Sequence, residues 1–421
     1  MKNHVLRGWA VAALLTSSLA AGDWTMFRGP TRNGLSTETG VPKMWDSKTN
    51  IKWKTPLPDA GNSSPVIGGD RVFLPCAQER GKKRGTYCFD RATGKQLWEQ
   101  IVPFDEEDPT HATNPYCGSS AALDGQRVVV WHGSAGVHCY DYDGKMLWSR
   151  DLGLFRHIWG YGSSPIFFQD MVILNCGPGE RQFLIALNPK TGETLWQTDI
   201  AGGDSGEKGK GGGGAWTGSW ATPTPIKVNG QSQLLVSLPD RAHAFDPRDG
   251  KILWTCSGLS KLCYTDALAG ETVGVAMSGF HGPAIAFRLG GEGDVTDTNR
   301  LWRQAQQNPQ RIGSGVVIGK HIFMANEPGI AQCLDLETGE ELWKTRLPGG
   351  NIWSSLIAAE GRLYVTTQQG KTLVYSANPE RFELLHENDI REPTNSTLAL
   401  SNGQIFLRTF KNLYCIEEAK P

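Results

Sequence analysis

The chain has 421 residues and carries 42 basic against 43 acidic side chains, for a formal net charge of −1. This nearly neutral net charge does not favour binding to nucleic acid or to an anionic membrane surface, and we expect neither as a partner. Hydrophobic residues make up 39% of the sequence beside 51 Gly and 15 Trp, which is typical of many short strands joined by turns and excludes general disorder.

The first residues have the pattern of an export signal. Lys2 and Arg7 give a positively charged start, residues 9–15 are apolar, and residues 18–20 form a small-x-small cleavage pattern. The apolar run is too short for a membrane anchor, and no Cys stands at the cleavage point to carry a lipid. We therefore expect residues 1–21 to be a signal peptide. The mature protein is predicted to be exported, to the periplasm or the extracellular space, without membrane insertion.

An N-terminal extension at 22–49 precedes a pattern that recurs along residues 50–421. A short apolar run ends in a small residue, an apolar residue and usually an acid, after which a Gly-bearing turn leads to a closing Leu-Trp. Units of about 40 to 60 residues, built from short strands and tight turns, are typical of propeller blades. We expect each Trp to wedge against the next blade. These structural tryptophans are Trp53, Trp98, Trp148, Trp196, Trp254, Trp302 and Trp343.

Each unit is predicted to hold four strands, and the third carries the small residue. That position occurs eight times, at residues 88, 139, 186, 244, 286, 333, 374 and 415. After the last copy the chain has no room for a fourth strand, whereas residues 51–53 form a fourth strand without a third before it. The sequence therefore predicts an all-β fold, an eight-bladed β-propeller of four-stranded antiparallel blades. The N-terminal strand completes the last blade, which removes the free sheet edges there.

Nine cysteines in an exported chain permit disulfides without proving them. Four of them, Cys88, Cys139, Cys333 and Cys415, occupy the small-residue position that other repeats fill with Ala or Val, so we expect packing residues there. Because nine is odd, at least one thiol stays unpaired in a monomer. The pairs that remain open to bridging are Cys76 with Cys88 and Cys256 with Cys263.

Strands alternate in direction within a blade, so the connections divide between two faces of the ring. Turns between the first and second strands and between the third and fourth share one face, here the turn face, and are short. Turns between the second and third strands share the other face, the loop face, with the connections between blades. Variable loops on a rigid scaffold commonly carry binding sites. The long loop-face segments are 102–117, 152–162, 200–220, 255–265, 303–313, 346–353 and 385–395.

Aromatic and polar side chains of the loop face are the candidate ligand-binding residues. Aromatic rings beside Asn, Arg and His commonly hold a sugar, a peptide or a planar ligand. The alternative is that the Trp residues only plug the channel mouth or cover neighbouring loops. The candidates are His111, Asn114, Arg156, Trp159, Tyr161, Trp216, Trp220, Asp266, Arg311 and Trp353.

The repeats resemble the PQQ-like (pyrroloquinoline-quinone-type) β-propeller repeat, Asp-x-x-Thr-Gly-x-x-x-Trp. Residues 90–98 and 335–343 match it best, and residues 24–30 with Asn33-Gly34 look like the start of exported members of that family. The resemblance covers essentially the whole mature chain. It implies the fold but leaves the function open, because the family includes quinoprotein dehydrogenases and a non-catalytic outer-membrane assembly factor of the BamB type.

Three functions are compatible with these observations. A quinoprotein dehydrogenase, by the resemblance, would hold PQQ between a Trp floor and a vicinal disulfide with Ca²⁺ nearby; the chain has no adjacent cysteines, and its candidate base is Asp266. A carbohydrate-active enzyme would use loop carboxylates such as Asp105, Glu106 or Asp266. His132 and His138 lack a third ligand, so no metal site is predicted. We favour an exported, monomeric, non-enzymatic propeller without a cofactor that binds a protein partner or a glycan through its loop face.

Overall fold

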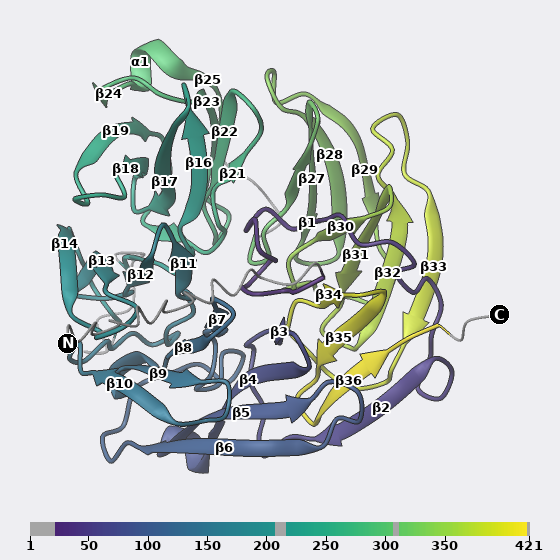
Figure 1. Cartoon of the computed structure of the whole chain (residues 1–421). Helices are drawn as coiled ribbons and strands as arrows, with labels where there is room; N and C mark the ends of the chain where they lie inside the picture. Colours follow the sequence, from purple (N-terminus) through teal and green to yellow (C-terminus); the bar gives the residue numbers. More distant parts are fainter. Residues whose placement is uncertain (1–21, 207–215, 306–310, 419–421) are drawn as a thin grey trace, which may run out of the picture.

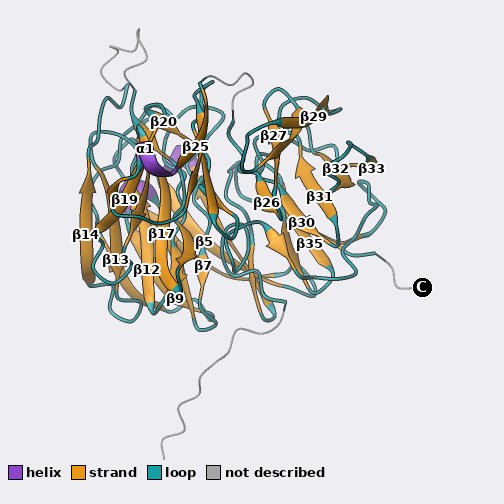
Figure 2. Ribbon diagram, turned by 90° about the horizontal axis from the view of Figure 1, so that it is seen from above, coloured by secondary structure: helices purple, strands orange, loops and turns teal. Residues whose placement is uncertain are grey.

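Eight four-stranded antiparallel sheets stand around a central axis in the computed structural model of the chain (Figure 1). The structure describes residues 22–206, 216–305 and 311–418, so the predicted signal peptide lies outside the described residues. Within each blade the strands follow one another outward from the axis, and edge-on they run between the two faces of the ring (Figure 2). The predicted eight-bladed β-propeller is confirmed.

The strands of the first four blades keep chain order from the axis outward. Blade 1 holds β3 (Val66–Gly68), β4 (Arg71–Gln78), β5 (Lys83–Asp90) and β6 (Gln96–Pro103). Blade 2 holds β7 (Ala122–Leu123), β8 (Arg127–Trp131), β9 (Val137–Asp141) and β10 (Met146–Arg150). Blade 3 holds β11 (Ile166–Phe168), β12 (Met171–Cys176), β13 (Gln182–Leu187) and β14 (Thr194–Ile200). Blade 4 holds β16 (Thr224–Val228), β17 (Gln231–Leu238), β18 (Arg241–Phe245) and β19 (Ile252–Ser257).

The remaining blades repeat this order, and the last one takes its outermost strand from the N-terminus. Blade 5 holds β21 (Leu268–Ala269), β22 (Val273–Met277), β23 (Ala284–Arg288) and β25 (Arg300–Gln304). Blade 6 holds β26 (Val316–Ile318), β27 (His321–Asn326), β28 (Ile330–Asp335) and β29 (Glu341–Arg346). Blade 7 holds β30 (Ile357–Ala359), β31 (Arg362–Thr366), β32 (Lys371–Ser376) and β33 (Leu384–Asp389). Blade 8 holds β34 (Ala399–Ser401), β35 (Gln404–Arg408), β36 (Asn412–Ile416) and β2 (Ile51–Pro56).

A few short elements decorate this ring. Strand β1 (Leu35–Ser36) runs parallel to β30, and β24 (Gly293–Asp294) runs parallel to β19. Strands β15 (Gly218–Ser219) and β20 (Leu262–Cys263) pair parallel with each other. The helical turns are η1 (Glu79–Gly81), η2 (Gly133–Ala135) and α1 (Thr296–Asn299). Within the described ranges no helix combines the length and the apolar character needed to cross a membrane.

The two ends of the chain close the ring as the sequence predicts. Strand β2 pairs antiparallel with β36, and Trp53 lies opposite Cys415 (Figure 1). An ion pair between Lys52 and Glu417, 2.7 Å from Nζ to Oε2, adds to the ladder. Blade 8 therefore has both outer and inner strands in register, and the last sheet presents the same outer edge as its neighbours.

The repeated Trp residues join each blade to the next. In six of the seven, the indole N–H donates a hydrogen bond of 2.8–3.0 Å to a backbone carbonyl in the following blade's turn between its third and fourth strands. The exception is Trp254, which donates to Gln233 Oε1 in its own blade. Gly250 shows why the turn needs glycine: its φ is +72°, and a Cβ there would collide with the Trp196 ring of the preceding blade.

The N-terminal extension lies across the turn face, and we call its residues 22–49 the strap. Several of its contacts are with the turns that join first and second strands. Asp23 accepts a hydrogen bond from the Gly69 N–H of blade 1, and Glu38 accepts one from the Gly403 N–H of blade 8. The Val41 N–H donates to Glu360 of blade 7. The strap thus covers much of the face opposite the long loops.

All nine cysteines are buried and unbridged, and all nine lie within the described ranges. The four at the small-residue position are wholly buried between strands, as expected of packing residues. The two pairs that the sequence left open to bridging therefore carry no disulfide in this structure. Burial raises the pKa of each of these four thiols to about 12, which keeps them protonated and unreactive at neutral pH.

Candidate functional site

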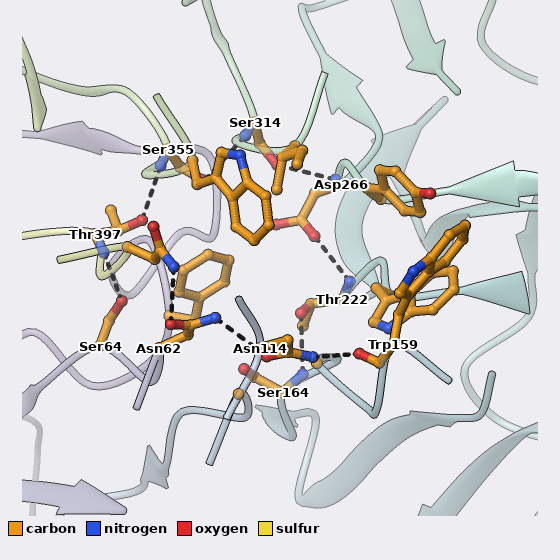
Figure 3. Close-up of a pocket in the computed structure, with 18 of the residues that line it drawn as sticks. Asn62, Ser64, Asn114, Trp159, Ser164, Thr222, Asp266, Ser314, Ser355 and Thr397 are labelled. Atoms are coloured by element: carbon orange, nitrogen blue, oxygen red, sulfur yellow. Dashed lines mark hydrogen bonds between the residues drawn. The ribbon is translucent and has the colours of Figure 1, made fainter. Parts of the chain in front are cut away.

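A cavity of about 320 Å³ opens on the loop face at the axis of the ring, and we call it the axial cup (Figure 3). Its walls come from loops that enter all eight blades, and Phe27 of the strap closes it from the turn face. The cup is therefore blind, with its mouth among the long loops. Its size suits a small ligand or one or two side chains of a larger one.

The floor of the cup is a closed ring of hydrogen bonds between blades. At the start of each first strand, a backbone N–H donates to the side-chain oxygen of the equivalent residue in the next blade, at 2.8–3.1 Å. Seven of the eight acceptors are hydroxyls and the eighth is a carboxylate. We call this set the axial ring: Ser64, Ser120, Ser164, Thr222, Asp266, Ser314, Ser355 and Thr397. Figure 3 labels all of these residues except Ser120.

Asp266 connects the axial ring to the strap. Its Oδ1 accepts the Thr222 N–H at 2.8 Å, and its Oδ2 lies 3.1 Å from Arg32 Nη2 and 3.6 Å from Arg28 Nη1. Burial lowers the pKa of Arg28 to about 10 and also lowers that of Arg32, so at neutral pH both remain charged. Both oxygens of the Asp266 carboxylate are therefore engaged by donors of the protein itself. The geometry thus assigns Asp266 to holding the strap rather than to base catalysis.

One side of the cup is aromatic. Trp159 and Trp220 lie with ring centroids 6.1 Å apart, and Tyr264 packs on Trp220 at 5.1 Å. Phe280 extends the wall at 5.8 Å from Trp159, and half of its side chain is exposed. Trp353 lies apart from these rings, where its indole N–H donates to Glu327 Oε2 at 3.2 Å. This wall offers flat apolar faces to a ligand.

The other side of the cup is lined by amides that bind one another. Asn395 donates to Asn62 Oδ1 at 3.2 Å, and Asn62 donates in turn to Asn114 Oδ1 at 3.1 Å. The Asn114 side-chain amide donates hydrogen bonds to the backbone carbonyls of Trp159 and Tyr161, at 2.7 and 3.0 Å. Because these donors and acceptors are satisfied within the protein, the amides fix the loops around the mouth.

The structure brings six of the ten predicted site residues together in the cup and places four outside it. His111, exposed at the rim, joins Asn114, Trp159, Trp220, Asp266 and Trp353 in the lining. The four outside the cup each contact a neighbouring loop. Trp216 packs edge-on behind Trp159, with ring centroids 4.7 Å apart. Tyr161 is buried and donates to the Tyr116 carbonyl, and Arg156 pairs with Glu106 at 3.1 Å. Arg311 is also buried and donates to the Gly282 carbonyl.

Sequence reasoning missed several groups that shape the cup. The Ser and Thr residues of the axial ring stand at the starts of the first strands, where their small size alone indicates close packing around the axis and not hydrogen bonding between blades. Their hydroxyls could have been recognised from the recurrence of an oxygen-bearing side chain at the same position of every blade. Nothing in the sequence indicated that Phe27, Arg28 and Arg32 of the strap reach the axis.

The residues of the cup do not fit a quinone–calcium centre or a glycosidase. Asp266 is the one carboxylate in the described lining, and both of its oxygens already accept hydrogen bonds. Across the described ranges, no three His, Cys, Asp or Glu side chains are grouped so that they could hold a metal ion. His132 and His138, with rings 5.7 Å apart, are buried, and burial lowers the pKa of both. Glycoside hydrolysis would need a second carboxylate beside Asp266.

Fold and site define the class of protein: a PQQ-like β-propeller with its turn face covered and an axial cup on its loop face. The sequence pattern described as "Outer membrane protein assembly factor BamB" matches residues 82–206, 180–287 and 291–379, which is more than half of the chain. The chain belongs to this BamB family of PQQ-like propellers.

Individual relatives agree with this assignment. The outer membrane protein assembly factor BamB of Burkholderia pseudomallei is 23% identical over 361 residues, which is 75% of this chain and 84% of that protein. The crystal structure of BamB from Moraxella catarrhalis aligns with a TM-score of 0.57 at 14% identity, over 91% of this chain and 98% of that one. A quinohemoprotein alcohol dehydrogenase from Comamonas testosteroni aligns with a TM-score of 0.64 at 13% identity, over 95% and 81%. Both structural likenesses show the shared fold alone.

Proposed function

We propose that this protein is an exported, non-enzymatic interaction propeller that binds a partner protein through its loop face. The observation that carries the proposal is the difference between the two faces. The strap covers the turn face, whereas the loop face carries the long connections and the mouth of the axial cup. A rigid ring that presents variable loops on one side suits a docking platform.

The family supports a role in protein assembly. The relatives in B. pseudomallei and M. catarrhalis are by name assembly factors of outer membrane proteins. We extend that role to this chain in its general form, a propeller that contacts another protein outside the cytoplasm. The export pattern at residues 1–21 supports the location.

A glycan is the second candidate ligand. The axial cup combines aromatic faces at Trp159 and Trp220 with hydroxyl and amide groups, a combination that also suits a sugar ring. A glycan array on the mature protein tests this candidate directly. Specific retention of one glycan class, abolished by Trp159→Ala, would favour it over a protein partner.

Site-specific photo-crosslinking tests the main proposal. A benzophenone amino acid replaces His111 or Trp353 at the cup mouth, and Lys95 or Glu337 in exposed turns of the turn face serves as the matched control. Cells of the source organism are irradiated, and adducts are identified by mass spectrometry. We expect one defined protein adduct from both loop-face positions and none from the control positions. Adducts from the turn face alone would contradict the proposal.

A further inference from the structure

The hydroxyls of the axial ring have protons to donate. Each ring oxygen accepts the N–H of the preceding blade, and the hydroxyl protons of the residues that line the cup have no acceptor among the described residues. The side chains are almost wholly buried, with exposed fractions of 1–4%. A buried donor without an acceptor is costly, so these groups point to an acceptor supplied by a ligand. They are Ser64, Ser164, Thr222, Ser314, Ser355 and Thr397.

The charge beneath this floor is positive. Arg28 and Arg32 are both fully buried, and Asp266 is the one carboxylate paired with them within the described part of the chain, which leaves a net charge of +1. The Nε and Nη1 atoms of Arg28 have no hydrogen-bond partner there. Buried charge is normally neutralised by a partner. The floor is therefore arranged for a group that accepts hydrogen bonds and carries negative charge.

The aromatic wall adds a requirement of shape. Trp159, Trp220 and Tyr264 rise from one side of the floor and face a space that also contains Phe27. A ligand whose anionic end reaches the axial ring would place its next group against these rings. A flat or large apolar group fits that place best.

We propose that the axial cup binds the C-terminal carboxylate of a polypeptide, with an aromatic or large apolar terminal side chain against Trp159, Trp220 and Tyr264. The hydroxyls of the axial ring donate to the carboxylate, and Arg28 supplies the opposite charge from below. The inference rests on the proposed function, since it names the part of the partner protein that enters the cup. Capture of a terminal carboxylate by clustered donors is a known mode of peptide recognition.

The charge separates this ligand from a neutral sugar. Sugar hydroxyls could accept from the axial ring, but they would leave the net charge of +1 on Arg28, Arg32 and Asp266 without a further counterion. The amides on the opposite wall already bind one another and offer few donors for the many hydroxyls of a sugar. A carboxylate uses both the free O–H donors and the charge.

Calorimetric titration of the mature protein with a matched pair of peptides tests the proposal. The probes are acetyl-Gly-Gly-Phe with a free carboxylate and the same peptide with a C-terminal amide; maltotriose is the third titrant. We expect the acid to bind at least about tenfold more tightly than the amide, because hydrogen bonds to an ionised acceptor are the stronger ones. Equal affinity for both peptides, no binding of the acid at millimolar concentration, or binding of maltotriose alone would overturn the proposal.

Two substitutions that change the net charge under the floor in opposite directions distinguish an effect of charge on binding from a general structural effect. Asp266→Asn keeps an oxygen for the Thr222 N–H and raises the net charge under the floor, so it should tighten binding of the acid peptide by roughly threefold or more. Arg28→Gln removes one positive charge and should weaken binding by a similar factor. Asp246→Asn, which alters an acid paired with Arg248 in a distant turn, is the matched control and should change neither affinity. If Asp266 and Arg28 had a purely structural role, both substitutions would weaken binding of the acid peptide, and that result would contradict the assignment.

The outcome is distinguishable from failure of the proposed function. Loop-face crosslinks to a partner, together with equal binding of acid and amide peptides, would remove the carboxylate site and leave the docking face intact. If the protein binds the acid peptide more tightly than the amide but no loop-face crosslink forms, the carboxylate site is supported. The same result would count against a protein partner as the physiological ligand of that site.

Discussion

Removal of one hydroxyl from the axial ring should destabilise the whole propeller. In Ser164→Ala, the Ser120 N–H loses its acceptor, the Ser164 Oγ at 2.9 Å, in a place where both residues are at most 2% exposed. A buried N–H left without a partner costs about 1–3 kcal/mol. The substitution also removes the Ser164 hydroxyl proton, which has no acceptor among the described residues, so part of that cost is offset and the net loss should lie near the lower end of this range.

The neighbouring residue provides the matched control. Ser163 is also wholly buried, but its hydroxyl has no hydrogen-bond partner within the described residues. Ser163→Ala makes the same chemical change and should be neutral or slightly stabilising, because it removes an unsatisfied polar group. Urea titrations followed by tryptophan fluorescence give the free energy of unfolding of each variant. Equal free energies of unfolding for the two variants would refute the idea that the axial ring holds the blades together.

Two further predictions concern stability. Gly250→Ala should lower the free energy of unfolding by about 2 kcal/mol or more in urea titrations, because the residue has a positive φ and faces the Trp196 ring. The control is Gly230→Ala, also at positive φ but with open space around it, which should lower the free energy of unfolding by only about 1 kcal/mol. Equal losses for the two variants would contradict the close packing of Trp196 against the turn of the next blade. Burial lowers the pKa of His157 and His243 to about 4 each, so the unfolded chain, with a histidine pKa of about 6.5, binds more protons between these values. The free energy of unfolding should therefore fall as pH drops from about 6.5 and level off near 4, and a constant value over that range would be inconsistent with neutral buried histidines.

The sequence predicts the ring well because the repeat is local and redundant. Most blades contain a recognisable third strand, Gly turn and closing Trp in their own sequence, so an atypical copy such as the one that ends at Trp302 is recognised by comparison with the other copies. The pairing of Trp53 with Cys415 follows from counting the strands. The tryptophan that departs from the hydrogen-bond pattern, Trp254, shows that a regular sequence position does not guarantee a regular contact.

The cup is harder to predict because its residues converge from distant parts of the chain. Loop aromatics such as Trp159 and Trp220 are conspicuous, but their facing partners, Asn62 and Asn395, are unremarkable polar residues in sequence. The strap is the larger surprise: only the three-dimensional path of residues 22–49 brings Arg28 under the floor. Residues that act through a shared axis carry no signal of that axis in their local pattern.

Hydrogen–deuterium exchange of the mature protein, with and without the partner captured by crosslinking, tests most directly whether the loop face is the working surface. The account predicts slower exchange on complex formation in segments 102–117, 152–162 and 346–353, with unchanged exchange in the strap and in the turns around Gly94 and Gly339. Protection confined to the strap or to those turns would mean that the partner occupies the opposite side of the ring.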